Sequence, residues 1–518
     1  MAQPLQSINL VAPAFKGLNT EDSPLQQDPS FAEVADNCVI DERGRIASRK
    51  GINRLTSAGA TEFGSDRVHR IHYFFDEAGN EEVFLAGNDK IFRASTTTTT
   101  YDSLDDVTPA AYTVTANNWK IINFNDSCYF FQLGHEPLKW TDGDTDLVAT
   151  GLASTYWGNE AISAYGRLWV ANNGADQQTV FWSDLLIDDF TTGSSGSIDV
   201  SKVWPDGQDN IVGLCAHNGF LLIFGEHSIL VYGGADAPST MALADTVSGV
   251  GCVDRNSIQN IGTDVMFLSH SGLRSFGRVI QEKSMPISDL SRTIKRDIIQ
   301  NISLSTEPVA SGYSPENSFY LLTFPDQDTT YCFDLTTRLE NGAFRVTRWP
   351  SALHKCYARK LDGTFYIGTN TGFGEYDTYQ DQLQPYTLSY ISPSLTFGDP
   401  TRAKILKKLR PTIVGANSAP VVLKWAYDFS TSYKTSTFTA GNQVPAYYNA
   451  GSQFGTSPDG QGTTFEESEF TGGRLTTRRP VNTTGYGSVV SIGLESEIDG
   501  DALSLQEINV LALIGKIL

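Results

Sequence analysis

Apolar residues in this chain fall in short runs that are interrupted by tight turns, and few of them recur at helical spacing. The clearest run covers residues 211–232, IVGLCAHNGFLLIFGEHSILVY, with turns at residues 217–219 and 226–228. Alternating apolar residues between turns rich in Gly, Asn and polar residues are typical of antiparallel hairpins. The segment therefore predicts a three-stranded meander.

Six other segments repeat this arrangement, each with two turns separated by one strand. Their turns lie at Gly79 and Asp89, Asp126 and Glu136, Gly166 and Gln177, Asp264 and Gly272, Asn317 and Asp326, and Gly363 and Gly372. The first turns are spaced by about 40 to 54 residues, as expected for β-propeller blades. We therefore predict an all-β fold with a β-propeller of about seven blades, although six or eight also fit the spacing. A β-sandwich or several small β domains share this turn spacing and remain the alternative.

The pattern divides the chain into three parts. Residues 1–60 contain several prolines and little periodicity, and they predict an extended N-terminal arm of the kind that ties subunits together. Residues 61–380 hold the propeller with inserted loops, including the threonine run 96–100. Residues 381–518 have longer strands and wide loops and predict a C-terminal β-rich domain, whose loop 431–474 is expected to order only in an assembly.

One helix interrupts the β pattern. In DLSRTIKRDIIQNI, Leu290, Ile294 and Ile298 recur every four residues, and Ser288 or Asp289 can cap the first turn. We expect the apolar side of this helix to face the core.

The composition narrows the function classes. The 518-residue chain has a formal net charge of −21, which argues against a surface that grips phosphate backbones but suits the wall of a conduit that repels DNA. The six cysteines have no CxxC spacing, so we expect buried, reduced thiols. Neither a secretory signal nor an apolar run long enough to span a bilayer is visible, and we expect the protein to be made and folded in the cytoplasm.

Residues with catalytic potential show no catalytic pattern. His69 and His72 would point to opposite faces of a strand, which spoils a shared metal site. The segment 457–465, SPDGQGTTF, is close to the Asp-box of propeller sialidases, but its glycine stands one position late. We expect no enzyme activity, no catalytic residue, no metal and no cofactor.

Basic residues cluster at one place. In TRAKILKKLRP, a strand would put Lys404, Lys408 and Arg410 on one side, where they could contact an acidic neighbouring subunit or DNA. A solvated strand face is the alternative. Arg478 and Arg479 form a second, smaller basic group.

Two blocks of sequence resemble a known family. In GLNTEDSPLQQDPSFAEVADNCVIDERGRIASRKG, six residues fit the opening pattern of many tailed-phage tail proteins: Ala35, Asn37, Gly44, Ile46, Arg49 and Gly51. The second block is FGEHSILVYGG followed by GVGCVDRNSIQNIGTDVMFLSHSGLRSF, within residues 224–276. Together they resemble the tail nozzle proteins of podoviruses, which are short-tailed phages: the tail tubular protein B and packaged-DNA stabilisation proteins.

The resemblance implies a β-propeller with appended β domains and a place in the virion tail. It further implies a ring of about six copies below the portal and the adaptor, which retains packaged DNA and opens for ejection. The adaptor and other tail proteins would be the partners, and DNA would pass without specific binding. A carbohydrate-binding or carbohydrate-degrading propeller, such as a tail spike, is the alternative function. A propeller scaffold for other proteins is a third possibility.

Overall fold

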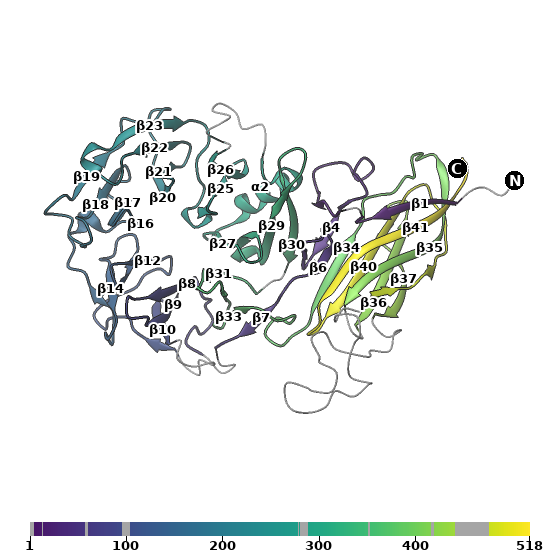
Figure 1. Ribbon diagram of the computed structural model, residues 1–518, viewed down its shortest axis with the longest axis horizontal. Coiled ribbons are helices and arrows are strands. Elements are labelled where there is room, and N and C mark those ends of the chain that lie inside the picture. Colours follow the sequence, from purple (N-terminus) through teal and green to yellow (C-terminus); the bar gives the residue numbers. More distant parts are fainter. Residues whose placement is uncertain are drawn as a thin grey trace, which may run out of the picture.

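The computed structural model describes residues 5–12, 14–56, 61–95, 104–277, 279, 289–350, 353–415, 419–440 and 476–517. Figure 1 shows a ring of small sheets at one end of the molecule and a domain of long strands at the other, joined along the longest axis.

The ring is built from consecutive antiparallel meanders. Within the described residues there are six four-stranded blades and, between the fourth and the sixth, one blade with three strands. Blade 1 contains β8 (Arg70–Phe75), β9 (Glu81–Gly87), β10 (Lys90–Ser95) and β11 (Asp105–Asp106). Blade 2 contains β12 (Lys120–Phe124), β13 (Ser127–Phe131), β14 (Leu138–Thr141) and β15 (Val148–Ala149). Blade 3 contains β16 (Glu160–Ala164), β17 (Arg167–Ala171), β18 (Thr179–Trp182) and β19 (Gly196–Asp199). Blade 4 contains β20 (Ile211–His217), β21 (Phe220–Gly225), β22 (Ile229–Gly233) and β23 (Ala242–Val247). Blade 5 contains β24 (Gln259–Asn260), β25 (Val265–Ser269) and β26 (Gly272–Ser275). Blade 6 contains β27 (Ala310–Ser314), β28 (Phe319–Phe324), β29 (Thr329–Arg338) and β30 (Phe344–Pro350). Blade 7 contains β31 (Cys356–Arg359), β32 (Phe365–Gly368), β33 (Phe373–Tyr376) and β7 (Ile52–Arg54).

The predicted all-β propeller is thereby confirmed. The segment 211–232 forms β20, β21 and most of β22, and Asn218 and Gly219 in its first turn have φ values of 48° and 82°. Two successive positive φ values are the geometry of the two-residue hairpin turn that matches strand twist. Local residue choice therefore fixes this hairpin.

Neighbouring blades pack face to face through large apolar side chains. The Phe84 ring of blade 1 lies 5.2 Å from Phe130 of blade 2, and Phe224 of blade 4 lies 5.0 Å from Phe267 of blade 5, measured between centroids. Because each sheet is covered on both faces, its strands are buried throughout, as in β13 and β28. The innermost strands lie side by side around the axis, and β31 returns beside β8.

The N-terminal segment adds strands to sheets of its own chain. β7 pairs antiparallel with β33 and completes blade 7, while β4 (Val34–Asp36) lies between β30 of the propeller and β34 of the second domain. The parallel strands β2 (Gly17–Leu18) and β3 (Phe31–Ala32) lie between these insertions and the N-terminus. An extended segment without its own core is stabilised here by the open edges of larger sheets.

The second domain has two sheets around one core. The first sheet continues the propeller sheet beyond β4 with β34 (Tyr386–Ile391), β40 (Val490–Ile498), β36 (Pro420–Tyr427) and β37 (Lys434–Thr439). The second contains β38 (Thr476–Arg478), β39 (Val481–Asn482), β35 (Arg402–Gly415), β41 (Leu503–Ile517), β1 (Leu5–Leu10), β6 (Ile46–Ser48) and β5 (Cys38–Ile40). Their core is continuous with that of blades 5 and 6, since Leu494 and Leu505 belong to the same apolar cluster as Leu268 and Phe344.

Helical segments are few among the described residues. They include α2 (Lys295–Leu304) and the 3₁₀ turns Ser154–Tyr156, Pro238–Thr240, Arg255–Ser257, Arg292–Ile294 and Pro325–Gln327. Leu290, Ile294 and Ile298 are buried, as predicted, but α2 begins later than expected and has no side-chain cap. The Asp289 carboxylate instead accepts bonds from the amide and hydroxyl of Ser291, and Ser288 lies outside the described residues. Within the part described, no helix is long and apolar enough to cross a bilayer.

Candidate functional site

The first residues of the inner strands meet at one end of the propeller channel, which we call the entry end; the opposite end is the exit end. Arg70, Lys120 and Glu160 begin the inner strands of blades 1, 2 and 3 and occupy equivalent positions there. In a repeat architecture, equivalent positions lie at one level around the axis. Three ionisable side chains are thus brought together from segments 40 or more residues apart.

Ion pairs connect these side chains across the entry end. Lys120 Nζ lies 2.9 Å from Glu160 Oε1, and Arg255 Nη1 of blade 5 lies 3.9 Å from Glu160 Oε2. Arg255 also donates through Nη2 to the carbonyl of Asn118, over 2.7 Å. Because blades 5 and 2 lie on different sides of the ring, Arg255 spans the channel.

A second guanidinium spans the channel in another direction. Arg70 Nη1 donates to Asn256 Oδ1 over 3.1 Å, from blade 1 to blade 5. The carboxylate of the adjacent Asp254 accepts the amide of Asn256, and its other oxygen accepts the amide of Val309 at 2.9 Å. We call Arg70, Lys120, Glu160, Asp254, Arg255 and Asn256 the axial plug.

Burial governs the ionisation of the plug. Desolvation lowers the pKa values of Arg70, Lys120 and Arg255, and the Glu160 carboxylate partly opposes this. Burial also raises the pKa of Asp254, against its two backbone bonds and the nearby arginines. Both carboxylates are therefore engaged in structural contacts, and the plug crosses the channel with paired charges instead of presenting a free acid and base.

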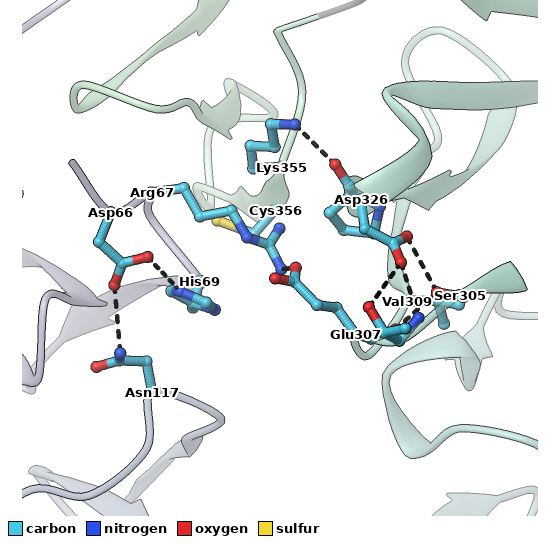
Figure 2. A network of polar contacts seen from close by, with 12 residues as sticks. Asp66, Arg67, His69, Asn117, Ser305, Glu307, Val309, Asp326, Lys355 and Cys356 are labelled. Carbon is cyan, nitrogen blue, oxygen red and sulfur yellow. Dashed lines mark hydrogen bonds and ion pairs between the residues drawn. The ribbon is translucent and has the colours of Figure 1, made fainter.

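Polar contacts around the plug tie the entry loops together (Figure 2). Asp66 contacts His69 Nε2 at 2.9 Å and accepts Asn117 Nδ2 at 3.3 Å, which joins blades 1 and 2. Arg67 pairs with Glu307, which precedes blade 6. The rim therefore connects segments up to 240 residues apart.

Lys355 and Asp326 continue the rim on the side of blades 6 and 7. Lys355 donates to the Pro325 carbonyl over 2.8 Å and pairs with Asp328, while Asp326 accepts from Ser305. Every one of these charged groups has a protein partner. The charged side chains of the rim are consequently held in place by contacts within the protein.

The two histidines singled out from the sequence have separate partners. His69 contacts Asp66 at the rim, whereas His72 Nε2 lies 2.8 Å from Asn123 Oδ1, between the inner strands of blades 1 and 2. Desolvation, together with the charges of Arg70 and Lys120, lowers the pKa of His72 to about 4. Across the described ranges, no group of three His, Cys, Asp or Glu residues is placed to hold a metal. The sialidase-like segment 457–465 lies outside those ranges.

Residues of the first resembling block gather where the propeller joins the second domain. Arg49 is buried, and its guanidinium bonds both carboxylate oxygens of Asp381, one of them at 2.9 Å. The guanidinium also stacks 4.2 Å from the Tyr386 ring and donates to Asn37 Oδ1 at 3.2 Å. Arg49 thus connects the N-terminal segment to the start of the second domain.

Glycine is required at one position of this junction for steric reasons, and an asparagine nearby adopts a left-handed conformation. A Cβ at Gly51 would lie 2.0 Å from the Gln380 carbonyl oxygen, so only glycine allows this close approach. Asn37 has φ 53° and donates to the Thr387 carbonyl at 2.9 Å, and Gly44 turns the chain with φ 72°. A cleft of about 580 Å³ opens beside the junction.

The second resembling block contains Asp254, Arg255 and Asn256 of the axial plug. Sequence reasoning attached no role to these three residues, and the block was the signal that could have identified them. Arg70, Lys120 and Glu160 have no comparable signal, because their importance depends on the closure of the ring.

The predicted one-sided stripe of Lys404, Lys408 and Arg410 is wrong. Lys404 is fully buried and its Nζ bonds the Asp399 carbonyl, whereas Lys408 is exposed and Arg410 is half-buried. The register of β35 against β41 shifts between Leu406 and Lys408, and this bulge exposes both Lys407 and Lys408. An extra residue reverses the side on which all later residues point.

Comparisons with known proteins give structural likeness only. No protein-family model matches the chain. No curated protein matches it either. Among solved structures, the chain is similar to streptogramin B lyase, with 10% identity, a TM-score of 0.35, and coverage of 64% of this chain and 96% of that one. It is also similar to the extracellular domain of a one-component system from B. thetaiotaomicron, with 11% identity and a TM-score of 0.31, over 74% of this chain. The chain spans 41% of the length of that domain.

Proposed function

We propose that this chain is a structural subunit of the tail nozzle of a short-tailed phage. In this proposal, about six copies form a ring that retains packaged DNA and conducts it during ejection. The observation that carries the proposal is the location of the resembling residues. Those of the first block build the domain junction around Arg49, and the second block supplies the part of the axial plug that spans the channel.

The mechanical construction supports this role. One sheet runs from β27 of the propeller through β4 to β37 of the second domain, and one apolar core accompanies it. A continuous sheet and core transmit load between domains better than a flexible linker does. A tube wall under pressure from packaged DNA needs such stiffness.

The electrostatics support a passage between subunits. The ion pairs of the axial plug cross the channel within each propeller, so in this proposal DNA passes through the middle of a ring of copies. The net charge of −21 repels a polyanion and favours transit without binding. A conduit in this role requires no enzyme activity, no cofactor and no specific DNA contact.

Mass photometry and electron microscopy of the purified chain test the proposal. We expect a closed ring with a mass near six times the 56.6 kDa of one chain, and an open axial passage. A single copy at every accessible concentration would contradict the proposed function. The same preparation should show no turnover of capsular or lipopolysaccharide sugars. Turnover that Glu160→Gln or Glu307→Gln abolishes would instead establish the carbohydrate-degrading alternative.

A further inference from the structure

A loop of blade 3 exposes three consecutive large apolar side chains at the exit end. Leu185, Leu186 and Ile187 follow β18 and have exposed fractions of 52%, 56% and 53%. Soluble proteins seldom leave such a group in water unless a partner covers it. The loop is therefore a candidate contact surface.

The backbone of this loop is held in an energetically unfavourable conformation at Leu186. Leu186 has φ 58°, in the left-handed region that bulky residues rarely adopt. Its amide donates to the Gly166 carbonyl at 2.8 Å, and its carbonyl accepts Asn125 Nδ2 at 2.9 Å. Bonds from two neighbouring hairpins thus hold a strained residue whose side chain reaches water. Strain maintained in this way points to a function.

Hydrogen bonds show that the surface extends over adjacent blades. Next to Asn125, the carboxylate of Asp126 accepts the amide of Glu77 at 2.9 Å, two residues beyond the exposed Phe75. On the other side, the hydroxyl of Tyr165, beside Gly166, donates to the carbonyl of Phe220 at 2.9 Å, and Phe220 is also exposed. We call Phe75, Leu185, Leu186, Ile187 and Phe220 the exit surface.

Carboxylates border the exit surface. Glu77, Asp126 and Asp142 are exposed on the turns of blades 1 and 2, and Asp188 and Asp189 follow Ile187 directly. Asp188 forms an ion pair with Lys139, and the carboxylate of Asp189 accepts hydrogen bonds from the hydroxyls of Thr191 and Thr192 in its own turn. The remaining acids leave an apolar surface with an acidic border. A partner that fits it combines apolar or aromatic side chains with lysine or arginine.

The opposite end of this chain offers that combination. Lys407 and Lys408 are exposed at the bulge of β35, and Phe429 and Tyr486 are 62% and 68% exposed. We call these four residues the sandwich surface. Figure 1 places β35 at one end of the longest axis and β18 and β19 at the other.

Backbone bonds show that the sandwich surface is continuous. The amide of Thr483 donates to the Lys407 carbonyl at 3.2 Å, and Gly487, next to Tyr486, pairs with β35 at Lys404. The adjacent Ser488 donates to the carboxylate of Asp428, which precedes Phe429. Phe429 has φ 60°, so this surface also holds a bulky exposed residue in the left-handed region.

We propose that the exit surface of one copy docks on the sandwich surface of the next copy. The two surfaces are complementary in charge and both are apolar, and they lie at opposite ends of one chain. Contact between two different surfaces of identical subunits is heterologous and closes into a ring when the rotation allows it. The inference rests on the proposed function, because it specifies the subunit interface of the proposed ring.

Two charge-changing variants test the interface separately. Leu185→Asp/Ile187→Asp alters only the exit surface, and Lys407→Glu/Lys408→Glu alters only the sandwich surface. We expect each to raise the concentration at which copies assemble at least tenfold, with unchanged circular dichroism. Leu133→Asp, at the entry end of blade 2, is one matched control that should assemble like the native chain. Arg292→Glu/Arg296→Glu is the other, because both side chains are exposed, Arg292 on the 3₁₀ turn before α2 and Arg296 on α2 itself.

Mixing the two variants distinguishes this geometry from others. Each variant keeps one intact surface, so an equimolar mixture should form pairs of twice the 56.6 kDa chain mass and no ring. Leu186→Gly adds an independent measurement, because glycine relieves the left-handed strain. We expect it to melt at a higher temperature and yet assemble more weakly.

The outcomes separate the inference from the proposed function. Rings that form equally well from either double variant, or a mixture of folded variants that gives no pairs, would overturn the proposed interface and leave the nozzle role intact. A native chain that stays a single copy at all concentrations would overturn both.

Discussion

Removing the buried negative charge of Asp381 should destabilise the junction between the two domains. In Asp381→Asn, the Arg49 guanidinium keeps its place but loses its counter-charge. The Arg49 side chain is 1% exposed, so water cannot replace the lost partner. Breaking a buried ion pair by removing one partner typically costs about 3–5 kcal/mol. Asparagine retains one acceptor oxygen, and the neighbouring Tyr386 ring still faces the cation, so we expect about 3 kcal/mol.

Urea unfolding followed by tryptophan fluorescence measures this cost. Trp349 lies 5.6 Å from the Arg49 guanidinium, so one of the eight tryptophans is placed at the junction itself. The double variant Arg49→Met/Asp381→Leu removes both charges and should recover to within about 1 kcal/mol of the native free energy of unfolding. A loss below about 1 kcal/mol in Asp381→Asn, or a double variant as unstable as the single one, would refute the reasoning.

Three further predictions follow from the same structure. Gly51→Ala should lose about 2–3 kcal/mol, measured by thermal melting, because the new methyl group would meet the Gln380 carbonyl; a native-like melting temperature would contradict the close approach. The pKa of His72 is about 4 in the folded chain and about 6.5 when unfolded, so the folded chain binds a proton on His72 only at lower pH than the unfolded chain does. The stability present above pH 6.5 should therefore fall by roughly 2–3 kcal/mol as pH decreases toward 4. His72→Gln should reduce the shift in urea midpoint between pH 7 and pH 4.5, and an unchanged shift would exclude His72 as its source. All six cysteines are buried and unpaired, so a thiol reagent should label them quickly only after denaturation, and rapid labelling of the native chain would contradict their burial.

The hairpins could be predicted from the sequence because their information is local. Residues 211–232 contain both the alternating apolar residues and the turn residues that the meander requires, and the structure places β20 and β21 accordingly. The buried side of α2 was predictable for the same reason, since Leu290, Ile294 and Ile298 follow its period.

Features that depend on distant residues were not predictable. The contact from Arg255 to Asn118 joins residues 137 positions apart, and nothing near either residue indicates it. At Lys407 a single-residue bulge reversed the predicted orientation of the basic strand, because alternation alone carries no sign of a register shift. The sequence predicts an arm where the structure has short strands, since two- and three-residue strands such as β4 and β7 can be recognised only beside the sheet edges with which they pair.

The pairing of β7 with β33 also has a consequence for synthesis. Residues 52–54 leave the ribosome early, but their pairing partner, residues 373–376, emerges more than 300 residues later. The first strand of this ring must therefore wait, unpaired, until the last blade has been translated. Rings of this kind close slowly, since contacts between remote segments form late in folding. Nascent chains that stop before residue 373 should thus contain a propeller whose last blade is incomplete and whose ring is not closed.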